Sequence, residues 1–128
     1  MIKIGIFLEG TPKMGGGFFQ SLKSSMMLLN IKKYNSNMDL IITNNSTKNY
    51  FLNKDIKFTL FKSNKIKKYF SEFFEIDIIR ELLTKLRINH PFTTFIKKQK
   101  YDLIIFFGPS SMAKYCSGIS FIFNIWDL

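Results

Sequence analysis

Three consecutive glycines, Gly15 to Gly17, lie between an apolar segment and an amphipathic one. Residues 2–8 form a run of apolar side chains typical of a buried strand, and residues 18–29 have the spacing of a helix. Glycine has no Cβ, so the backbone N–H groups of such a loop can approach a ligand closely. The first N–H groups of a helix lack intrahelical partners and lie at the positive end of its dipole. The pattern predicts a phosphate or diphosphate site, and it is equally compatible with a turn whose glycines serve only backbone geometry.

Polar side chains also follow several of the apolar segments. Glu9 comes directly after the first, Ser110 and Ser111 follow the fourth, and Asp127 follows the last. The carboxyl ends of parallel strands share one edge of a sheet, where open α/β proteins bind ligands. These residues are therefore candidates for a cleft. Each also has a structural interpretation, as a solvated loop carboxylate for Glu9 and as helix N-caps for the serines and Asp127.

The elements that would position these residues alternate between strands and helices. Continuous apolar runs predict strands near residues 2–8, 38–43, 56–61, 102–107 and 120–125. Helical patterns cover residues 18–29 and 64–86, with shorter ones near 92–98 and 110–115, whereas residues 44–47 are typical of a turn. Strands without in-and-out alternation favour a parallel sheet covered on both faces. We expect a Rossmann-like α/β fold with a mostly parallel sheet of about five strands, the first one central.

The composition limits the classes of function. The 128 residues are one domain, and the formal net charge is +10. Only Arg80 and Arg87 are arginines, and the abundance of Lys with Asn, Ile and Phe indicates A/T-rich codons, which explains much of the basic excess. Nucleic-acid binding, which favours arginines and a recognisable module, is not predicted. A dinucleotide site is disfavoured, because the second strand ends in Thr43-Asn44-Asn45 without an acidic residue.

Single residues bear on metals and location. Cys116 is the only cysteine and His90 the only histidine, so neither an intrachain disulfide, nor a cysteine-based metal cluster, nor a poly-histidine site is expected. Cys116 is interpreted as a small buried hydrophobe and His90 as a surface residue. The sequence has neither the pattern of a signal peptide nor a membrane span, which predicts a cytoplasmic protein.

Lysines and aromatic residues interleave over residues 62–74. A helix of this kind can lie at an anionic membrane surface, or it can bury its aromatic side chains in the fold and expose its lysines, which is the commoner arrangement. In the first case Phe70, Phe73 and Phe74 would point outward. A peripheral contact with the inner face of the membrane is therefore one of two open interpretations.

Both ends of the chain resemble the N-terminal, acceptor-side domain of GT-B-fold retaining glycosyltransferases of the family 4 type. Members commonly open with a strand, a Gly-Gly loop that often carries Gln, and a long helix, as residues 2–29 do with Gln20 after the glycines. Residues 101–107 and 119–128 look like a later strand and the hydrophobic strand that ends in His-Asp in many members. Here that end is Trp126-Asp127, and residues 44–100 carry no matching motif.

The resemblance implies a hexosyltransferase-type enzyme that moves a sugar from a nucleotide-sugar to the hydroxyl of a glycan or lipid-linked acceptor in cell-surface polysaccharide synthesis. It implies no metal and no cofactor beyond the donor. The implied donor diphosphate site is Gly15, Gly16 and Gly17, and the implied catalytic residue is Asp127. The implied contacts to acceptor or cleft are Glu9, Gln20, Ser110, Ser111 and Trp126.

The family's acidic donor-binding motif and basic diphosphate-binding residues belong to a C-terminal domain. We therefore expect residues 1–128 to be a truncated fragment that is inactive alone. Two other functions stay open: a nucleotide- or phosphate-binding Rossmann module without transferase activity, and a non-catalytic interaction domain.

Overall fold

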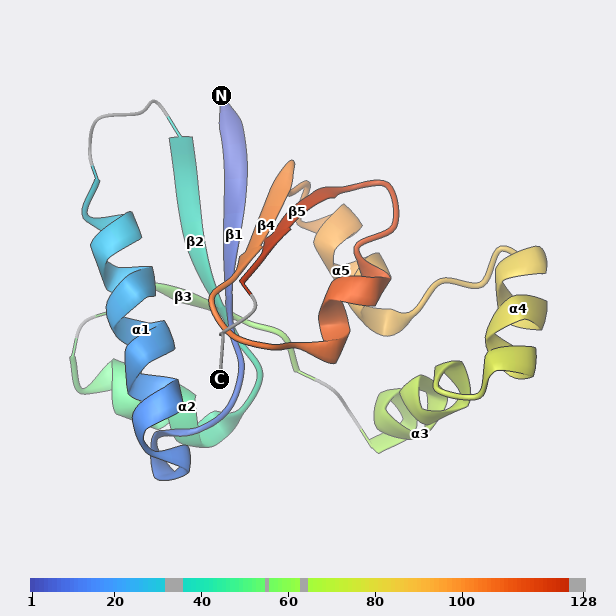
Figure 1. The fold of residues 1–128 in the computed structure, drawn as a ribbon, viewed down its shortest axis with the longest axis horizontal. Helices are drawn as coiled ribbons and strands as arrows, with labels where there is room; N and C mark the ends of the chain where they lie inside the picture. The colour runs from blue at the N-terminus through green and yellow to red at the C-terminus, as the bar shows by residue number, and fades with distance from the viewer. Residues whose placement is uncertain (32–35, 55, 63–64, 125–128) are drawn as a thin grey trace.

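The computed structural model describes residues 1–31, 36–54, 56–62 and 65–124, and within them the chain forms one all-parallel five-stranded sheet (Figure 1). The strands are β1 (Ile2–Leu8), β2 (Ser36–Ile42), β3 (Phe58–Leu60), β4 (Leu103–Phe106) and β5 (Ser120–Phe123). Their order is β3-β2-β1-β4-β5, and every neighbouring pair is parallel. The Rossmann-like α/β fold with a central first strand is thus confirmed.

Helices cover both faces of the sheet. They are α1 (Gly16–Leu29), α2 (Asn45–Leu52), α3 (Lys65–Phe74), α4 (Asp77–Lys85) and α5 (Pro91–Lys98), with the short 3-10 helices η1 (Pro12–Met14) and η2 (Ser111–Tyr115). In Figure 1, α1 and α2 lie on one side of the sheet and α5 and η2 on the other, with α3 and α4 beyond α5. None of the helices within the described residues has the length and apolar character of a membrane span.

The pleat of the strands divides the apolar side chains between two cores. Ile6 and Leu8 of β1 point toward α1 and α2, where they pack with Phe18, Leu22 and Phe51. Phe7, between them in sequence, points to the opposite face and packs with Phe92 and Phe106. Alternate residues of one strand thus fill both layers, which is why the strands are continuous apolar runs.

Two of the sequence predictions, for residues 44–47 and for His90, are wrong. Residues 44–47 are not an isolated turn but the N-terminus of α2, because the Asn44 side-chain oxygen accepts a hydrogen bond of 2.9 Å from the Thr47 N–H and so caps the helix. His90 is not a surface residue. It is 3% exposed and stacks on Tyr115, with ring centroids 3.7 Å apart.

Other predictions are confirmed. Cys116 is buried, and burial raises the pKa of its thiol to about 11, as fits a small hydrophobe rather than a reactive group. The helical pattern over the described part of residues 64–86 is two helices, α3 and α4. Phe74 of α3 is buried and Phe70 packs against the same core, whereas Phe73 is half exposed. The expectation that all three phenylalanines point outward at a membrane surface is therefore wrong for Phe70 and Phe74.

Candidate functional site

A pocket of about 300 Å³ lies at the carboxyl ends of β1 and β4. The chain leaves β1 toward β2 on one side, while β4 is the neighbour on the other side, so the connections diverge between these two strands. Such a switch point is where open α/β sheets form their ligand crevice. The lining residues come from β1, the loops after β1 and β4, and the start of α1: Phe7, Glu9, Gly10, Met14, Gly17, Phe18, Ser21, Gly108, Pro109 and Ser110.

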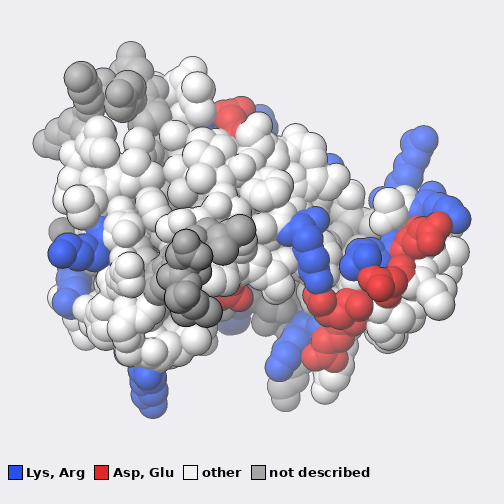
Figure 2. Space-filling model, in the orientation of Figure 1, with Lys and Arg blue, Asp and Glu red and all other residues white. Residues whose placement is uncertain are grey.

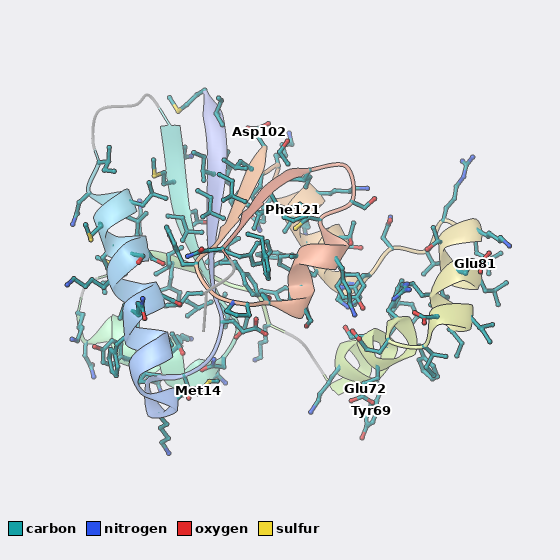
Figure 3. The ribbon with its side chains drawn as sticks, viewed as in Figure 1. Met14, Tyr69, Glu72, Glu81, Asp102 and Phe121 are labelled. Atoms are coloured by element: carbon teal, nitrogen blue, oxygen red, sulfur yellow. The ribbon has the colours of Figure 1, made fainter. Side chains whose placement is uncertain are left out.

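The loop after β1 is held in a tight conformation. Gly10 has a φ of +94°, and a Cβ at this position would lie 2.7 Å from the sulfur of Met14, whose turn precedes α1 (Figure 3). The Gly10 carbonyl accepts hydrogen bonds from Asn44 Nδ2 at 2.7 Å and from Thr47 Oγ1 at 2.9 Å. The N-terminus of α2 therefore fixes one wall of the pocket, and only glycine fits at its bend.

The start of α1 presents free backbone donors. Gly15 precedes the helix with a φ of +77° and a ψ of −141°, a conformation open essentially to glycine alone. No side chain caps this end, and the first intrahelical bond runs from the Phe19 N–H to the Gly15 carbonyl. The N–H groups of Gly16 and Gly17 thus precede the hydrogen-bonded ladder. A Cβ added at Gly16 meets no atom within 4 Å, so this part of the loop is open.

Small residues let α1 approach the loop after β4. A Cβ at Gly108 would lie 3.2 Å from Ser21 Oγ, which comes from the buried face of α1. Ser25, one turn later on the same face, is fully buried and donates its hydroxyl to the Ser21 carbonyl at 2.7 Å. Close packing at Gly108 brings the loop after β4 against α1, and both Ser21 and Gly108 line the pocket.

The pocket is nearly free of charge. Glu9 is its single ionisable lining residue among those the structure describes, and the remaining walls are aromatic, aliphatic, glycine and hydroxyl-bearing. Without a cation in the lining, the local attraction for a phosphate comes from the helix N-terminus. The Glu9 carboxylate and the serine hydroxyls can accept hydrogen bonds from the hydroxyl groups of a sugar.

The sequence-predicted residues divide between the pocket and its surroundings. Glu9, Gly17 and Ser110 line it, and Ser110 also caps η2 by accepting from the Met112 N–H at 3.1 Å, as its structural interpretation expected. Gly15, Gly16, Gln20 and Ser111 do not line it; Gln20 and Ser111 are exposed. Trp126 and Asp127 lie outside the described residues.

Several contributors went unrecognised in the sequence. Gly10, Ser21 and Gly108 line the pocket, and Asn44 and Thr47 support it from behind. The position of Gly10 and Asn44 directly after strands was a usable signal, because both lie on the ligand-binding edge. The approach of Ser21 to Gly108 had no signal in the sequence spacing.

Two further observations concern metal binding and similarity to known proteins. Among the residues that the structure describes, no three His, Cys, Asp or Glu side chains come together in a way that could hold a metal ion. Comparison of the chain with protein-family models, with curated proteins and with solved structures found no match.

Proposed function

We propose that this domain is the acceptor-side half of a GT-B-type glycosyltransferase, and that the pocket between β1 and β4 receives part of a nucleotide-sugar. The observation that carries the proposal is the juxtaposition of the glycine turn before α1 with a pocket at the switch point of a parallel sheet. The open space at Gly16 lets a diphosphate approach the free N–H groups of the helix. Glu9 and Ser110 line the same pocket and supply acceptors for sugar hydroxyls.

The described residues place no cation in the lining of this pocket, and this shapes the proposal. A diphosphate carries more charge than one helix N-terminus can neutralise, so a second domain would supply the basic groups. Under this proposal, residues 1–128 bind a nucleotide-sugar weakly and do not turn it over. The acceptor is a glycan or lipid-linked hydroxyl, and the reaction takes place in the cytoplasm, at the inner face of the membrane. Robust transfer by residues 1–128 alone would contradict this division of labour.

The alternative is a phosphate- or nucleotide-binding module without transferase activity. The two functions differ in what the pocket recognises beyond phosphate. Titration calorimetry with UDP-glucose, UDP and inorganic pyrophosphate separates them. A transferase half binds the sugar nucleotide more tightly than pyrophosphate, because the walls around Glu9 and Ser110 then contact the sugar. A phosphate-binding module binds all three ligands equally.

The residue-level test is Gly16→Val, with Asn45→Val as its control. Gly16 and Asn45 are both the first residues of helices, α1 and α2, but only the first helix begins at the pocket. The added side chain at Gly16 meets open space and leaves folding intact, yet it blocks the ligand's path to the N–H groups. We expect the loss of such a donor to cost about 3 kcal/mol in the transition state of transfer when the donor half is present. Equal ligand affinity in the two variants would mean that the glycine turn shapes the backbone and does not contact the ligand.

A second element of the proposal is a peripheral membrane contact made by other side chains than Phe70 and Phe74, which pack in the core. Tyr69 and Phe73 are exposed one turn apart on α3, and Ile78 and Leu82 are exposed one turn apart on α4. Figure 3 shows Tyr69 and Glu72 on the side of α3 away from the sheet. Figure 2 shows acidic as well as basic side chains gathered over these helices. The contact would therefore depend on apolar insertion more than on net charge.

A further inference from the structure

A second pocket lies on the far side of η2, between the end of α4 and the body of the domain. It has a volume of about 240 Å³, and its walls come from the end of α3, α4, residues 87–90, α5, η2 and Ser117. Arg80, Arg87 and Lys114 line it, and no carboxylate side chain of the described residues does so. The pocket at β1 and β4, in contrast, has Glu9 as its charged lining residue. The charged side chains that line the two pockets therefore have opposite signs.

Both arginines of the chain are at this pocket. Arg80 and Arg87 are the only arginines among the 19 basic residues, and both line it. A guanidinium group presents a planar fork of N–H donors that binds phosphate or carboxylate through two parallel hydrogen bonds, whereas lysine acts as a point charge. In a chain that uses lysine for its other positive charges, two arginines at one pocket fit the recognition of an anion better than they fit solubility.

Arg87 lies just after α4 and leaves its guanidinium group unpaired within the described residues. Arg87 follows α4 with a φ of +56°, the left-handed conformation that glycine usually occupies after a helix. Its N–H donates to the Thr84 carbonyl at 3.0 Å, and the Ile88 N–H donates to the Leu83 carbonyl at 2.9 Å, which closes the helix end. Within the described part of the chain, the guanidinium group makes no hydrogen bond or ion pair. Lys100 follows α5 with the same conformation, so the backbone here marks a helix end. What bears on an anion site is the unpaired guanidinium group of Arg87 at the pocket.

One wall of the pocket is a cluster of packed rings. His90 stacks on Tyr115, and the Phe74 ring meets the His90 ring edge-on. His90 Nδ1 accepts from the Phe92 N–H at 3.1 Å, so its Nε2 carries the proton and donates to Ser71 Oγ at 2.9 Å. The imidazole is thus fixed in place and its ring nitrogens are fully occupied, which makes it part of the wall rather than a ligand.

The two other cations of the pocket are oriented by carboxylates outside it. Arg80 pairs with Asp77 at 2.5 Å, and Lys114 pairs with Glu75 at 2.6 Å. Asp77 is 84% exposed, and exposed pairs of this kind contribute little energy, so an incoming anion can compete for both cations. Asn89 and Ser117 also line the pocket and add neutral hydrogen-bond donors.

We propose that this pocket binds a small soluble anion bearing a phosphate group, held between the guanidinium groups of Arg80 and Arg87 and the ammonium group of Lys114. The volume is below the ~300–1,000 Å³ of pockets for drug-sized ligands, which favours a phosphate with few attached atoms over a whole nucleotide-sugar. The inference is independent of the function proposed for the pocket at β1 and β4. The same 3-10 helix joins the two sites, because Ser110 before η2 lines the first pocket and Lys114 within η2 lines the second.

The test uses the imidazole of His90 as its reporter. His90 is the only histidine, so its ring protons give one separate set of NMR signals, and it lines the pocket. Residues 1–128 are titrated with inorganic phosphate at constant ionic strength, with chloride as the comparison salt. We expect phosphate to shift the His90 signals saturably and chloride to leave them in place. A shift that follows ionic strength alone would overturn the proposal.

The decisive variant is Arg87→Gly, with Lys85→Gln as its control. Glycine suits the positive φ of residue 87, so this variant removes the guanidinium group and keeps or raises the melting temperature. Lys85 carries the same charge near the end of the same helix, but it pairs with Glu81 and does not line the pocket. We expect Arg87→Gly to weaken phosphate binding by about tenfold or more, and Lys85→Gln to change it by less than about twofold.

Three outcomes would overturn the assignment. Equal losses in the two variants would show diffuse charge attraction instead of a site. If Arg87→Gly bound phosphate as tightly as the unmodified chain, the guanidinium group of Arg87 would not take part in binding. Binding to vesicles that contain phosphatidic acid, without binding of inorganic phosphate or glucose 6-phosphate, would assign the surface to a lipid headgroup and contradict a soluble ligand.

Discussion

The phenol of Tyr101 donates a hydrogen bond of 2.5 Å to the carboxylate of Asp39 from the opposite side of β1. Asp39 belongs to β2, Tyr101 comes just before β4, and Gly5 of β1 is the register partner of Asp39. A Cβ at Gly5 would lie 3.2 Å from the Tyr101 ring and 2.7 Å from two isoleucine side chains. The glycine in the central strand therefore leaves the space through which Tyr101 reaches across the sheet. Thr59 of β3 donates its hydroxyl to the same carboxylate oxygen, so one acidic side chain ties together three segments.

Replacing Tyr101 by Phe should lower the free energy of unfolding by about 1.5–3 kcal/mol, because a hydrogen bond to a carboxylate is lost while the ring stays in place. Urea denaturation monitored by circular dichroism measures the change. Tyr50→Phe is the matched control, since the described residues give the Tyr50 hydroxyl no hydrogen-bond partner. Equal stabilities of the two variants would mean that the Tyr101–Asp39 bond contributes nothing.

Acid should destabilise the protein through His90. Burial lowers the pKa of His90 from 6.5 to about 4, with Lys114 adding to the effect and Glu75 opposing it. The folded state therefore favours the neutral imidazole, while the unfolded chain binds a proton at higher pH. Stability from this group is present above pH 6.5 and is lost as the pH falls toward 4. The full loss is about 3 kcal/mol.

His90→Asn isolates this contribution, because Asn does not titrate and can still accept the Phe92 N–H as an N-cap. Unfolding free energies between pH 6.5 and 4.5 should fall more steeply for the unmodified chain than for the variant. Parallel slopes would show that His90 has the same affinity for protons in the folded and unfolded states.

At the start of α1, Gly15 should be needed for folding and Gly16 should not. Gly15→Ala introduces a Cβ at a positive φ and should cost about 1–3 kcal/mol. Gly16→Ala places a better helix former in open space and should be neutral or stabilising by up to about 1 kcal/mol. Thermal melts of the two variants provide the comparison, and a lower melting temperature for Gly16→Ala than for Gly15→Ala would contradict the backbone argument.

A membrane contact through α3 and α4 should depend on exposed apolar side chains. Phe73→Ser removes a half-exposed ring and should weaken sedimentation with vesicles containing phosphatidylglycerol, whereas Phe19→Ser, on α1, should not. Salt should weaken binding by about 1 kcal/mol for each lysine whose attraction to the surface is screened. Vesicle binding that is unaffected by Phe73→Ser would place the contact elsewhere or exclude it.

The sheet could be predicted because the inner strands β1 and β4 are largely buried, and an apolar run such as residues 102–107 fits a strand that is covered on both faces. The edge strand β5 is exposed, and its apolar sequence alone indicated a strand. Helix α2 was missed because its apolar residues are few, and its stability depends on the cap at Asn44 and on the burial of Phe51. His90 seemed a surface residue because a lone His before Pro is typical of loops, and only the tertiary structure brings Tyr115 and Ser71 to its ring.

Most of the candidate pocket could not be predicted, since Glu9, Gly17 and Ser110 are three of its ten lining residues. Glu9 and Gly17 could be placed by their position after the first strand. The contact of Ser21 with Gly108 could not, because it depends on how closely α1 packs against a loop that follows a much later strand. Local patterns specify elements and their edges, whereas the fit between distant segments is a property of the folded chain.

The central position of β1 sets the order in which the molecule can be assembled during translation. β1 pairs with β2 early, but its other edge is completed by β4, and the Lys3 N–H bonds to Asp102 across 99 residues of sequence. Until the ribosome has released that region, β1 has an open edge and Phe7 lacks Phe92 and Phe106 as partners. Contacts this distant in sequence slow folding, and open strand edges recruit other chains. A nascent chain that stalls before Ser110 would therefore depend on chaperones and would have no ligand pocket at all.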